Sequence, residues 1–500
     1  MPISRRKLIL AFSGVAATAA FAACAAPTPT ASPPKPTEAP KPAATTAPAP
    51  AKPTEVPKPT AAAPATTAPA VKPTEAPAPT KPTEAPKPAA AAPAAGSAGQ
   101  KVLYWGSFGG NLGKAEQETV TRFNAQSKGT QVEYQFQGSY EETAGKLAAA
   151  LAAKQGLPDV TLLSDVWWQK FWLNATITPV DSYIGTAKAD YVDSFVEEGT
   201  RQGKMWWVPF ARSTPMLYYN KDHFKAGGLP DKAPESWTEF LEWAPKLVKR
   251  EGSELKQAAF GMPLGASYNA WVFQPVIWQF GGRYSNEKYE ITVAEPKAIE
   301  AGQHYADLVS KYKVASVPKD HQVDFQNGLI SMIFASTAGL AGIETNSKFP
   351  VGTGFLPKGP AGFGCCTGGS GLALLASSPE EKRAAGFEFV SFATSPDHTA
   401  WWSQNTGYMP VRKSALESLA MNAFYKEKPN FQTAVKQLPL TKPQDWARVG
   451  IGNGDQIIGK ALERITVANE PVQPVFNELK LQLEKEGKAV KEQLQKIGAL

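Results

Sequence analysis

The stretch Lys101-Val102-Leu103-Tyr104-Trp105 begins the part of the sequence that decides the fold. This short apolar run predicts a strand, and residues 116–127 carry apolar side chains at helical spacing. The pattern then predicts a second strand over 130–137, a second helix over 141–155 and a third strand over 159–163. Strand, helix, strand, helix, strand is the order typical of an open α/β sheet.

Loops at the ends of these strands are the expected place for a ligand. Open α/β sheets bind ligands in the crevice at the carboxyl ends of their strands. In this sequence those ends are 106–113, 138–140 and 164–168.

The rest of the chain continues with helices and short strands. Residues 100–500 are too many for one ordinary core, so two lobes are predicted. Further helices are expected over 237–251, with Ser236 as N-cap and Glu239 completing a capping box, and over 296–312, 380–394 and 469–495.

Residues 1–23 predict an export signal. A basic stub over 1–7 precedes an apolar run over 8–23 that is short for a permanent membrane span. The stub resembles a twin-arginine signal, and Phe21-Ala22-Ala23-Cys24 resembles a lipobox, which implies lipidation of Cys24. An ordinary cleaved signal with an incidental Cys is the alternative.

Residues 24–99 are predicted to form a disordered tether that begins at the lipid-anchored Cys24. Between residues 25 and 99, Ala, Pro, Thr, Lys and Glu dominate and no aromatic residue occurs. A Lys-Pro-Thr-Glu unit recurs at Lys35, Lys52, Lys72 and Lys81. Pro at this density blocks both helix and sheet, so an extended spacer is expected. A recognition segment for a Pro-binding domain is the alternative.

The excess positive charge belongs to this N-terminal region. The whole sequence has a net charge of +7, which by itself suggests nucleic acid or an anionic surface as a partner. Residues 100–500, however, contain 42 basic and 41 acidic residues. No nucleic-acid partner is therefore expected.

The folded part lacks the motifs of common enzymes and cofactor sites. It has no Gly-x-Ser-x-Gly elbow, P-loop, His-Glu-x-x-His or dinucleotide fingerprint. Three Cys and four scattered His argue against a metal site built from them. The adjacent Cys365 and Cys366 are expected to form a buried pair or a vicinal disulfide rather than a nucleophile. No catalytic residue, metal or cofactor is predicted.

Adjacent aromatic residues are the most unusual local feature. They occur at Trp167-Trp168, Trp206-Trp207, Tyr218-Tyr219 and Trp401-Trp402. In an extended segment one ring of each pair faces inward and the other outward. An outward ring with polar neighbours suits the apolar face of a sugar ring, whereas packing of all these rings in the core is the alternative.

The segment Pro209-Phe210-Ala211-Arg212-Ser213-Thr214-Pro215-Met216-Leu217-Tyr218-Tyr219-Asn220-Lys221-Asp222 gives the most specific indication of function. It resembles the entry into the second lobe in solute-binding subunits of bacterial ABC sugar importers. Further motifs of that family follow in the same order at 224–229, 234–240, 368–370, 387–392 and 406–411. The resemblance covers about residues 100–500.

This resemblance implies a two-lobed α/β fold of the periplasmic-binding-protein type (type II), with a hinge and a ligand cleft between the lobes. Lobe 1 is expected at about 100–212 and 330–375, and lobe 2 at about 213–329 and 376–500. Such a protein performs no reaction but delivers a solute to the permease subunits of an ABC transporter. It is implied to be a monomer, exported to the cell surface or periplasm and anchored through Cys24.

Within the family, the wording of 213–221 is most similar to glycerol-3-phosphate-binding proteins, which implies a set of ligand contacts. The set comprises Tyr140, Asp165 for ligand hydroxyls, Ser213 and Ser336 as donors, Gly369 through its backbone, Tyr408 near the phosphate, and Arg448 as the clamp. Arg suits phosphate because its planar guanidinium donates two parallel hydrogen bonds.

Two departures keep a sugar open as the ligand. Asp165 stands where the family has Glu, and Trp167 and Trp168 add ring surface that a small triol phosphate does not need. Both Trp are therefore expected ligand contacts, and a mono- or oligosaccharide is an equal candidate. Asp165 and Arg448 have an alternative role in an inter-lobe or surface salt bridge.

Two other classes of protein remain as alternatives. A surface glycoside hydrolase would need two carboxylates that face each other across the cleft. A carbohydrate-binding or adhesion domain on a stalk would have a flat aromatic patch and no hinge.

Overall fold

The computed structural model describes residues 99–500. The predicted export signal over 1–23, lipidation at Cys24 and the tether up to residue 98 lie outside the described residues. Within 99–500, none of the helices is both long and apolar enough to cross a bilayer.

The first sheet contains the strands that the sequence pattern predicts. Its order is β2-β1-β3-β14-β4, and β7 also pairs with β14. The strands are β1 (Gln100–Gly106), β2 (Thr130–Phe136), β3 (Val160–Ser164), β4 (Ile177–Thr178), β7 (Val208–Ser213) and β14 (Gly368–Leu375). β1 pairs in parallel with β2 and β3, whereas β14 runs antiparallel to its neighbours.

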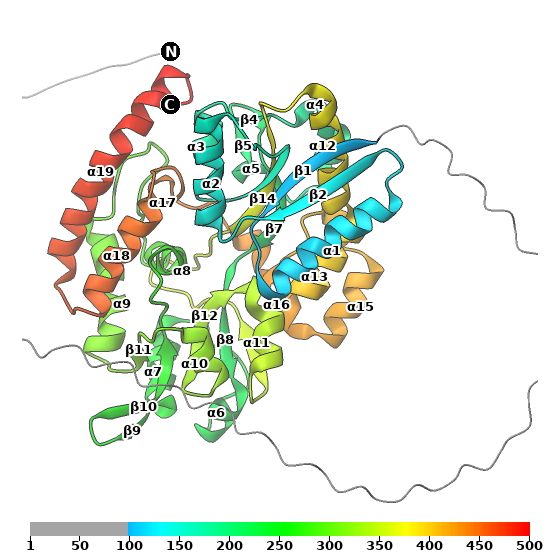
Figure 1. The fold of residues 1–500 in the computed structure, drawn as a ribbon. Helices are drawn as coiled ribbons and strands as arrows, with labels where there is room; N and C mark the ends of the chain where they lie inside the picture. The colour runs from blue at the N-terminus through cyan, green and yellow to red at the C-terminus, as the bar shows by residue number, and fades with distance from the viewer. Residues whose placement is uncertain (1–98) are drawn as a thin grey trace, which may run out of the picture. The chain divides into compact units, whose positions relative to one another are not determined.

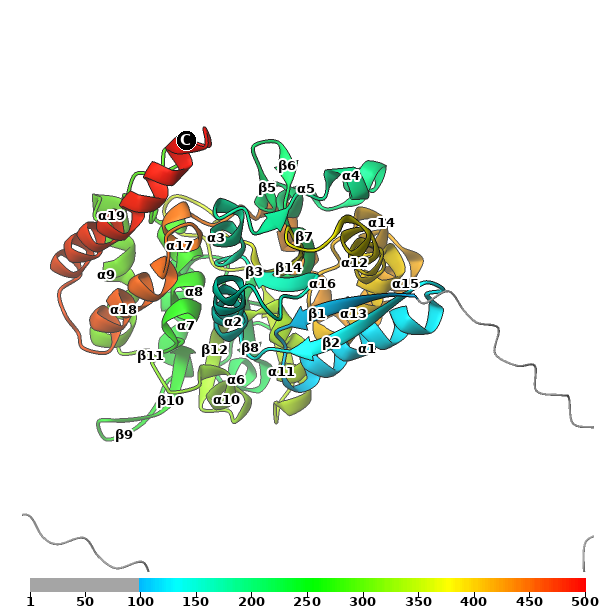
Figure 2. The same ribbon diagram turned by 45° about the horizontal axis from the view of Figure 1, so that its top comes forward.

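Helices cover both faces of this sheet (Figures 1 and 2). On one side lie α1 (Gly110–Gln126), α12 (Glu380–Ala393) and α13 (Pro396–Thr406), and on the other α2 (Tyr140–Ala153) and α3 (Trp168–Leu173). The alternation of strands and helices at the start of the chain therefore confirms the predicted α/β class.

The second sheet is built from the middle of the chain. Its order is β11-β10-β12-β8-β13, with β9 paired to β10. The strands are β8 (Pro215–Asn220), β9 (Lys249–Glu251), β10 (Glu254–Gly261), β11 (Ala315–Ser316), β12 (Ile330–Ser336) and β13 (Val351–Gly354).

A helical group adjoins the second sheet (Figure 1). It consists of α8 (Ala266–Gln279), α9 (Pro296–Ser310), α18 (Gly454–Thr466) and α19 (Val472–Lys496), which pack against one another. α8 and α18 approach so closely that a Cβ on Gly459 would lie 1.9 Å from the Ala266 carbonyl oxygen.

Shorter elements complete the described chain. They are α4 (Asp181–Ile184), α5 (Asp193–Glu198), α6 (Lys221–Ala226), α7 (Trp237–Leu247), α10 (His321–Gln326), α11 (Leu340–Asn346), α14 (Lys413–Leu416), α15 (Leu419–Glu427), α16 (Pro429–Gln437) and α17 (Trp446–Val449), the hairpin β5 (Thr200–Arg201) and β6 (Lys204–Met205), and the 3-10 turns Gly185–Asp190, Thr337–Gly339 and Leu438–Leu440.

The chain passes between the two sheets more than once, but two of the ranges assigned to the lobes differ from the arrangement of the sheets. Of the range 330–375 assigned to lobe 1, only β14 lies in the first sheet, because β12 and β13 both pair with β8. Conversely, two helices from the range assigned to lobe 2 belong with the first sheet. Helix α12 packs against β1, β2 and β14, and α13 packs against α1 and α12.

Helix α7 differs slightly from its prediction. The Ser236 hydroxyl accepts a hydrogen bond from the Glu239 amide at 3.1 Å, so the predicted N-cap is confirmed. The Glu239 carboxylate, however, accepts from the Glu235 amide rather than from Ser236. The helix ends at Leu247 rather than 251, because 249–251 pairs with β10 as strand β9.

The adjacent aromatic residues mostly build the core. Trp168, Trp207 and Trp402 are completely buried, and the ring preceding each is partly buried. Tyr218 and Tyr219 are both buried, contrary to the expectation of one outward ring, because β8 lies in the interior of the second sheet.

Candidate ligand-binding site

A cavity of about 310 Å³ gathers residues from widely separated parts of the chain. Seven residues expected from the sequence line it, namely Tyr140, Asp165, Ser213, Ser336, Gly369, Tyr408 and Arg448. They come from strand ends, helix starts and connections of both sheets. The structure therefore brings these seven together, while contact with a ligand remains a prediction.

Tyr140 is placed by the start of α2. Ser139 is its N-cap, and the Ser139 hydroxyl and the Glu142 carboxylate each accept the other residue's backbone N–H in a capping box. The Tyr140 hydroxyl donates to Ser370 Oγ at 3.2 Å and lies 3.3 Å from the Tyr408 hydroxyl. Two phenols of the expected site therefore share one hydrogen-bonded cluster.

Asp165 directly follows β3, at the strand end where the α/β pattern places a ligand site. Its backbone amide donates to the Gly369 carbonyl at 3.0 Å. Gly369 has φ +103°, and a Cβ there would lie 2.1 Å from the Ala211 carbonyl oxygen. Only glycine fits at this close approach of β7 and β14.

Asp165 and Arg448, two charged residues that line the cavity, are linked through Gln444. Gln444 Nε2 donates to Asp165 Oδ2 and to the Thr367 carbonyl, and Arg448 Nη1 donates to Gln444 Oε1. The Arg448 guanidinium lies 4.0 Å from the Asp165 carboxylate. Asp165 is 6 % exposed and Arg448 4 %.

The electrostatic environment of Asp165 has opposing parts. Burial raises the pKa of its carboxyl to about 6, and the nearby Glu198 acts in the same direction. Arg448, Arg212 and the hydrogen bond from Gln444 lower the pKa and so favour the charged form. Asp165 therefore titrates within a range that solution experiments can reach.

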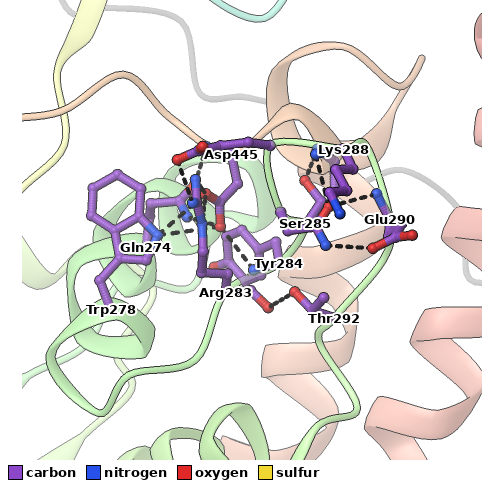
Figure 3. A network of polar contacts seen from close by, with 12 residues as sticks. Gln274, Trp278, Arg283, Tyr284, Ser285, Lys288, Glu290, Thr292 and Asp445 are labelled. Carbon is purple, nitrogen blue, oxygen red and sulfur yellow. Dashed lines mark hydrogen bonds and ion pairs between the residues drawn. The ribbon is translucent and has the colours of Figure 1, made fainter. Parts of the chain in front are cut away.

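The helix that carries Arg448 is held by a polar network around Asp445 (Figure 3). The buried Asp445 carboxylate accepts from Gln274 Nε2 and the Tyr284 amide, both at 2.8 Å, and from the Arg283 guanidinium at 2.7 Å. The Ser285 hydroxyl accepts from the Ala447 amide at 2.9 Å. These contacts fix α17 against α8 and the loop that follows it.

Two helices begin at the cavity. Tyr140 is the first residue of α2, and Ser267 and Tyr268 belong to the first turn of α8. The N-cap of α8, Gly265, supplies no capping side chain. The N-terminus of α8 lies next to Arg448, whose Nη2 donates to the Ser267 carbonyl, and its positive end favours an anionic group in this cavity.

Trp167 and Trp168, expected as ligand contacts, do not line the cavity. Trp168 is completely buried and stacks on Trp207, with ring centroids 5.8 Å apart and planes 10° from parallel. Trp167 is partly buried at the start of α3, with the Lys170 ammonium above its ring. The prediction of stacking rings was wrong for Trp168, because the chain turns into α3 and directs this indole to the core.

Sequence reasoning missed several residues at the cavity. Tyr268 and Trp271 line it from α8, and the Trp271 indole donates to the Thr367 carbonyl at 3.0 Å. The Tyr268 hydroxyl accepts from the Ser336 amide at 2.7 Å. Their i, i+3 spacing at the start of a helix was the available signal, but the same spacing is usual for core residues.

A larger cavity of about 730 Å³ lies on another side of Gln444. It is lined by residues such as Arg201, Arg283, Tyr289 and Trp446, and none of the expected site residues borders it. The convergence of the seven expected residues therefore favours the smaller cavity as the ligand site.

Cys365 and Cys366 are free thiols, so the vicinal disulfide that the sequence left open is absent. Both are buried, and burial raises the pKa of each thiol well above its ordinary value, which disfavours a nucleophilic thiolate. Within residues 99–500, no three His, Cys, Asp or Glu side chains cluster in a way that could hold a metal ion.

Comparison with known proteins identifies the family. The sequence pattern described as bacterial extracellular solute-binding protein matches residues 118–433, from α1 to α16. The chain belongs to this solute-binding protein family. Both the fold class and the resemblance drawn from the sequence are thus confirmed.

Named relatives of this solute-binding protein bind phosphorylated glycerols. The sn-glycerol-3-phosphate-binding periplasmic protein UgpB of Escherichia coli K12 is 28 % identical over 384 residues, which cover 71 % of this chain and 84 % of that protein. UgpB from Mycobacterium tuberculosis has been crystallised in complex with glycerophosphocholine. Its sequence is 36 % identical to this chain, the two structures superpose with a TM-score of 0.73, and the match covers 79 % of this chain and 98 % of UgpB.

More distant structures agree in fold alone. The GacH receptor of Streptomyces glaucescens, solved with and without acarbose, is 21 % identical with a TM-score of 0.66 and covers 78 % of this solute-binding protein and 99 % of the receptor.

Proposed function

We propose that this chain is the solute-binding component of an ABC importer and that its ligand is a glycerol phosphate, either free or as a glycerophosphodiester. The observation that carries the proposal is the convergence of Arg448, Asp165 and several hydroxyls on one cavity of about 310 Å³. A guanidinium beside a helix N-terminus suits a phosphate, and a carboxylate suits the hydroxyls of glycerol.

The names of the relatives support the same class of ligand. The Escherichia coli protein is named for sn-glycerol-3-phosphate, and the Mycobacterium tuberculosis structure contains glycerophosphocholine. Both compounds carry a phosphate on a glycerol, so both would present the anion and hydroxyls that the cavity matches.

A mono- or oligosaccharide is supported less well. The argument for a sugar depended on the rings of Trp167 and Trp168, and neither lines the cavity. The aromatic faces at the cavity come from Tyr268 and Trp271 together with the phenols Tyr140 and Tyr408. The buried Arg448 favours an anionic ligand over a neutral one, because its guanidinium pairs with a phosphate through charge as well as hydrogen bonds.

We assign no reaction to the site. A glycoside hydrolase needs two carboxylates about 5–9.5 Å apart around its substrate. The carboxylates at this cavity are Asp165, which Gln444 already engages, and Glu141, which is exposed at the rim. A cavity lined by the buried charges of Asp165 and Arg448 also argues against an adhesion domain with a flat binding patch.

The proposed location is outside the cytoplasmic membrane, with Cys24 as a lipid anchor and residues 25–99 as the tether. The export signal, the lipobox resemblance and the extracellular family support this location. The protein would act as a monomer that presents its solute to permease subunits. Mass spectrometry of the mature N-terminus tests the anchor: a diacylated Cys24 is expected, and an unmodified N-terminus would reject it.

Titration calorimetry tests the ligand. The full chain is titrated with sn-glycerol-3-phosphate, glycerophosphocholine and maltose, and a dissociation constant is expected for one or both glycerol phosphates. Arg448→Met should weaken that binding by about a hundredfold, because a charged hydrogen bond to phosphate is lost. Arg464→Met is the matched control, because Arg464 forms surface ion pairs with Glu470 and Glu478.

Two results would reject the proposed ligand. One is no heat of binding with either glycerol phosphate from protein that unfolds cooperatively. The other is binding of maltose alone, which would assign the cavity to sugars. Equal losses of affinity in the Arg448 and Arg464 variants would show that Arg448 does not contact the ligand.

A further inference from the structure

Strand β3 carries two buried hydroxyls that have no hydrogen-bond partner within residues 99–500. Thr161 is 0 % exposed and Ser164 2 % exposed, and Thr161 Oγ1 and Ser164 Oγ both lack a partner. Buried hydroxyls in folded proteins are normally hydrogen-bonded, so an unpartnered hydroxyl on a residue that lines a cavity is a candidate ligand contact.

The two hydroxyls differ in their relation to the cavity. Side chains alternate between the faces of a strand, so residues three positions apart lie on opposite faces. Ser164, the last residue of β3, lines the cavity together with Asp165, whereas Thr161 does not line it. Thr161 lies inside the sheet, opposite Trp105 of β1 and Ala373 of β14.

The polar neighbours of Ser164 are already engaged with one another. Ser370 lies opposite Ser164 on β14, and its Oγ accepts the hydrogen bond from Tyr140. Tyr140 in turn contacts Tyr408 at 3.3 Å, and Asp165 accepts from Gln444. Ser164 is thus a residue of the cavity wall whose buried hydroxyl the surrounding network leaves out.

A second unpartnered donor lies at the same cavity. Arg448 Nη1 donates to Gln444 and Nη2 to the Ser267 carbonyl at 3.2 Å, but the buried Nε has no partner within the described residues. Ser164 of β3 and Arg448 of α17 thus both line the cavity, and each carries a buried polar atom, Oγ and Nε respectively, that has no partner within the described residues.

We propose that Ser164 contacts the solute directly, through a hydrogen bond between its hydroxyl and a glycerol hydroxyl or phosphate oxygen. This inference rests on the proposed function and adds a residue that the family resemblance did not imply. It explains why an unpaired hydroxyl is tolerated in the core: the cost of leaving it unbonded in the empty site is offset when a solute oxygen arrives. Binding sites commonly give up stability in this way.

Paired variants of the two hydroxyls test this inference. Ser164→Ala removes the hydroxyl at the cavity, and Thr161→Val removes the other one with little change in shape. Calorimetry with sn-glycerol-3-phosphate and glycerophosphocholine should show about tenfold weaker binding for Ser164→Ala. Binding by Thr161→Val should equal that of the wild type.

Thermal unfolding distinguishes a ligand contact at Ser164 from a purely structural role of that residue. Without solute, the Tm of Ser164→Ala should equal or exceed that of the wild type, because an unbonded hydroxyl has been removed. With saturating solute, its Tm should rise by less than the wild-type Tm, because binding is weaker. Ser164→Cys, which keeps the size and offers a weaker donor, should give an intermediate affinity.

Inorganic phosphate distinguishes the two kinds of partner. If Ser164→Ala also weakens competition by phosphate, the partner is a phosphate oxygen; if competition is unchanged, the partner is a glycerol hydroxyl. Wild-type binding that Ser164→Ala leaves unaltered would overturn the assignment of Ser164 alone. Equal losses in Ser164→Ala and Thr161→Val would also overturn it, and absence of wild-type binding would overturn the proposed function as well.

Discussion

The Arg448 guanidinium lies 4.0 Å from the Asp165 carboxylate, and the side-chain amide of Gln444 bonds to both. Asp165 follows a strand of the first sheet, whereas Arg448 belongs to α17 beside the helices of the second sheet. A buried pair at this separation needs further hydrogen bonds to remain ordered. Gln444 supplies them and thereby joins the two halves of the cavity.

Replacing Gln444 should therefore disturb both charges. Gln444→Leu should weaken glycerol phosphate binding by about tenfold and lower the free energy of unfolding by about 1–3 kcal/mol, because Asp165 loses a donor inside the protein. Calorimetry and urea unfolding measure the two effects. Gln257→Leu is the matched control, because Gln257 is another buried amide whose bonds are to Leu247 and Ser331. It should lose stability without losing affinity, and equal affinities for both variants would contradict this role of Gln444.

The raised pKa of Asp165 gives the stability of the empty protein a pH dependence. The folded carboxyl titrates near pH 6, whereas an unfolded Asp titrates near about pH 4. Between these values the folded state holds a proton that the unfolded state has released, so the contribution of Asp165 to stability falls as the pH rises. Asp165→Asn cannot titrate and lacks this fall. Urea unfolding from pH 4 to 7 should show Asp165→Asn gaining on the wild type up to about pH 6 and then remaining level. A constant difference across the range would contradict the raised pKa.

Local patterns in the sequence were sufficient for the first three strands of the first sheet, but not for β4, β7 and β14. β1, β2 and β3 are separated by amphipathic helices, and their apolar runs lie where parallel strands are expected. The assignment of 330–354 failed because the pairing of β12 and β13 with β8 is a tertiary choice that no local pattern encodes.

The candidate site was predictable where a motif carried it and not elsewhere. Tyr408 and Arg448 were found through their family context, and both line the cavity. Gln444 carries no motif, and its bond to Asp165 spans 279 positions of the sequence. Ser164 lies within a strand pattern, and only its missing hydrogen bond draws attention to it. Such features arise from packing of distant segments.

Two tryptophans separate core packing from solute contact. Trp168→Phe should lower the free energy of unfolding by about 1–3 kcal/mol, since it leaves space next to Trp207, and should keep solute affinity unchanged. Trp271→Phe removes an indole that lines the cavity and bonds to Thr367, so it should weaken binding. Calorimetry and urea unfolding of both variants measure this contrast. Weaker binding in Trp168→Phe at full stability would restore the original expectation that its ring contacts the solute.

The buried ion pair of Arg212 and Glu198 should be strongly coupled. Arg212 is completely buried and its guanidinium lies 4.7 Å from the Trp207 ring, while Glu198 also accepts from Thr367 Oγ1 at 2.8 Å. Arg212→Met alone should cost about 3–5 kcal/mol of stability, because it leaves a buried carboxylate without its partner.

The double variant Arg212→Met with Glu198→Gln should recover most of that loss, since Gln is neutral and can still bond to Thr367. An exposed pair gives the scale for comparison: Arg464→Met should cost less than about 1 kcal/mol, because water screens its partners. Urea unfolding of the three variants measures the coupling. If the stability losses of the Arg212 and Glu198 changes simply add, the two side chains do not stabilise each other, which would contradict the coupling that their burial implies.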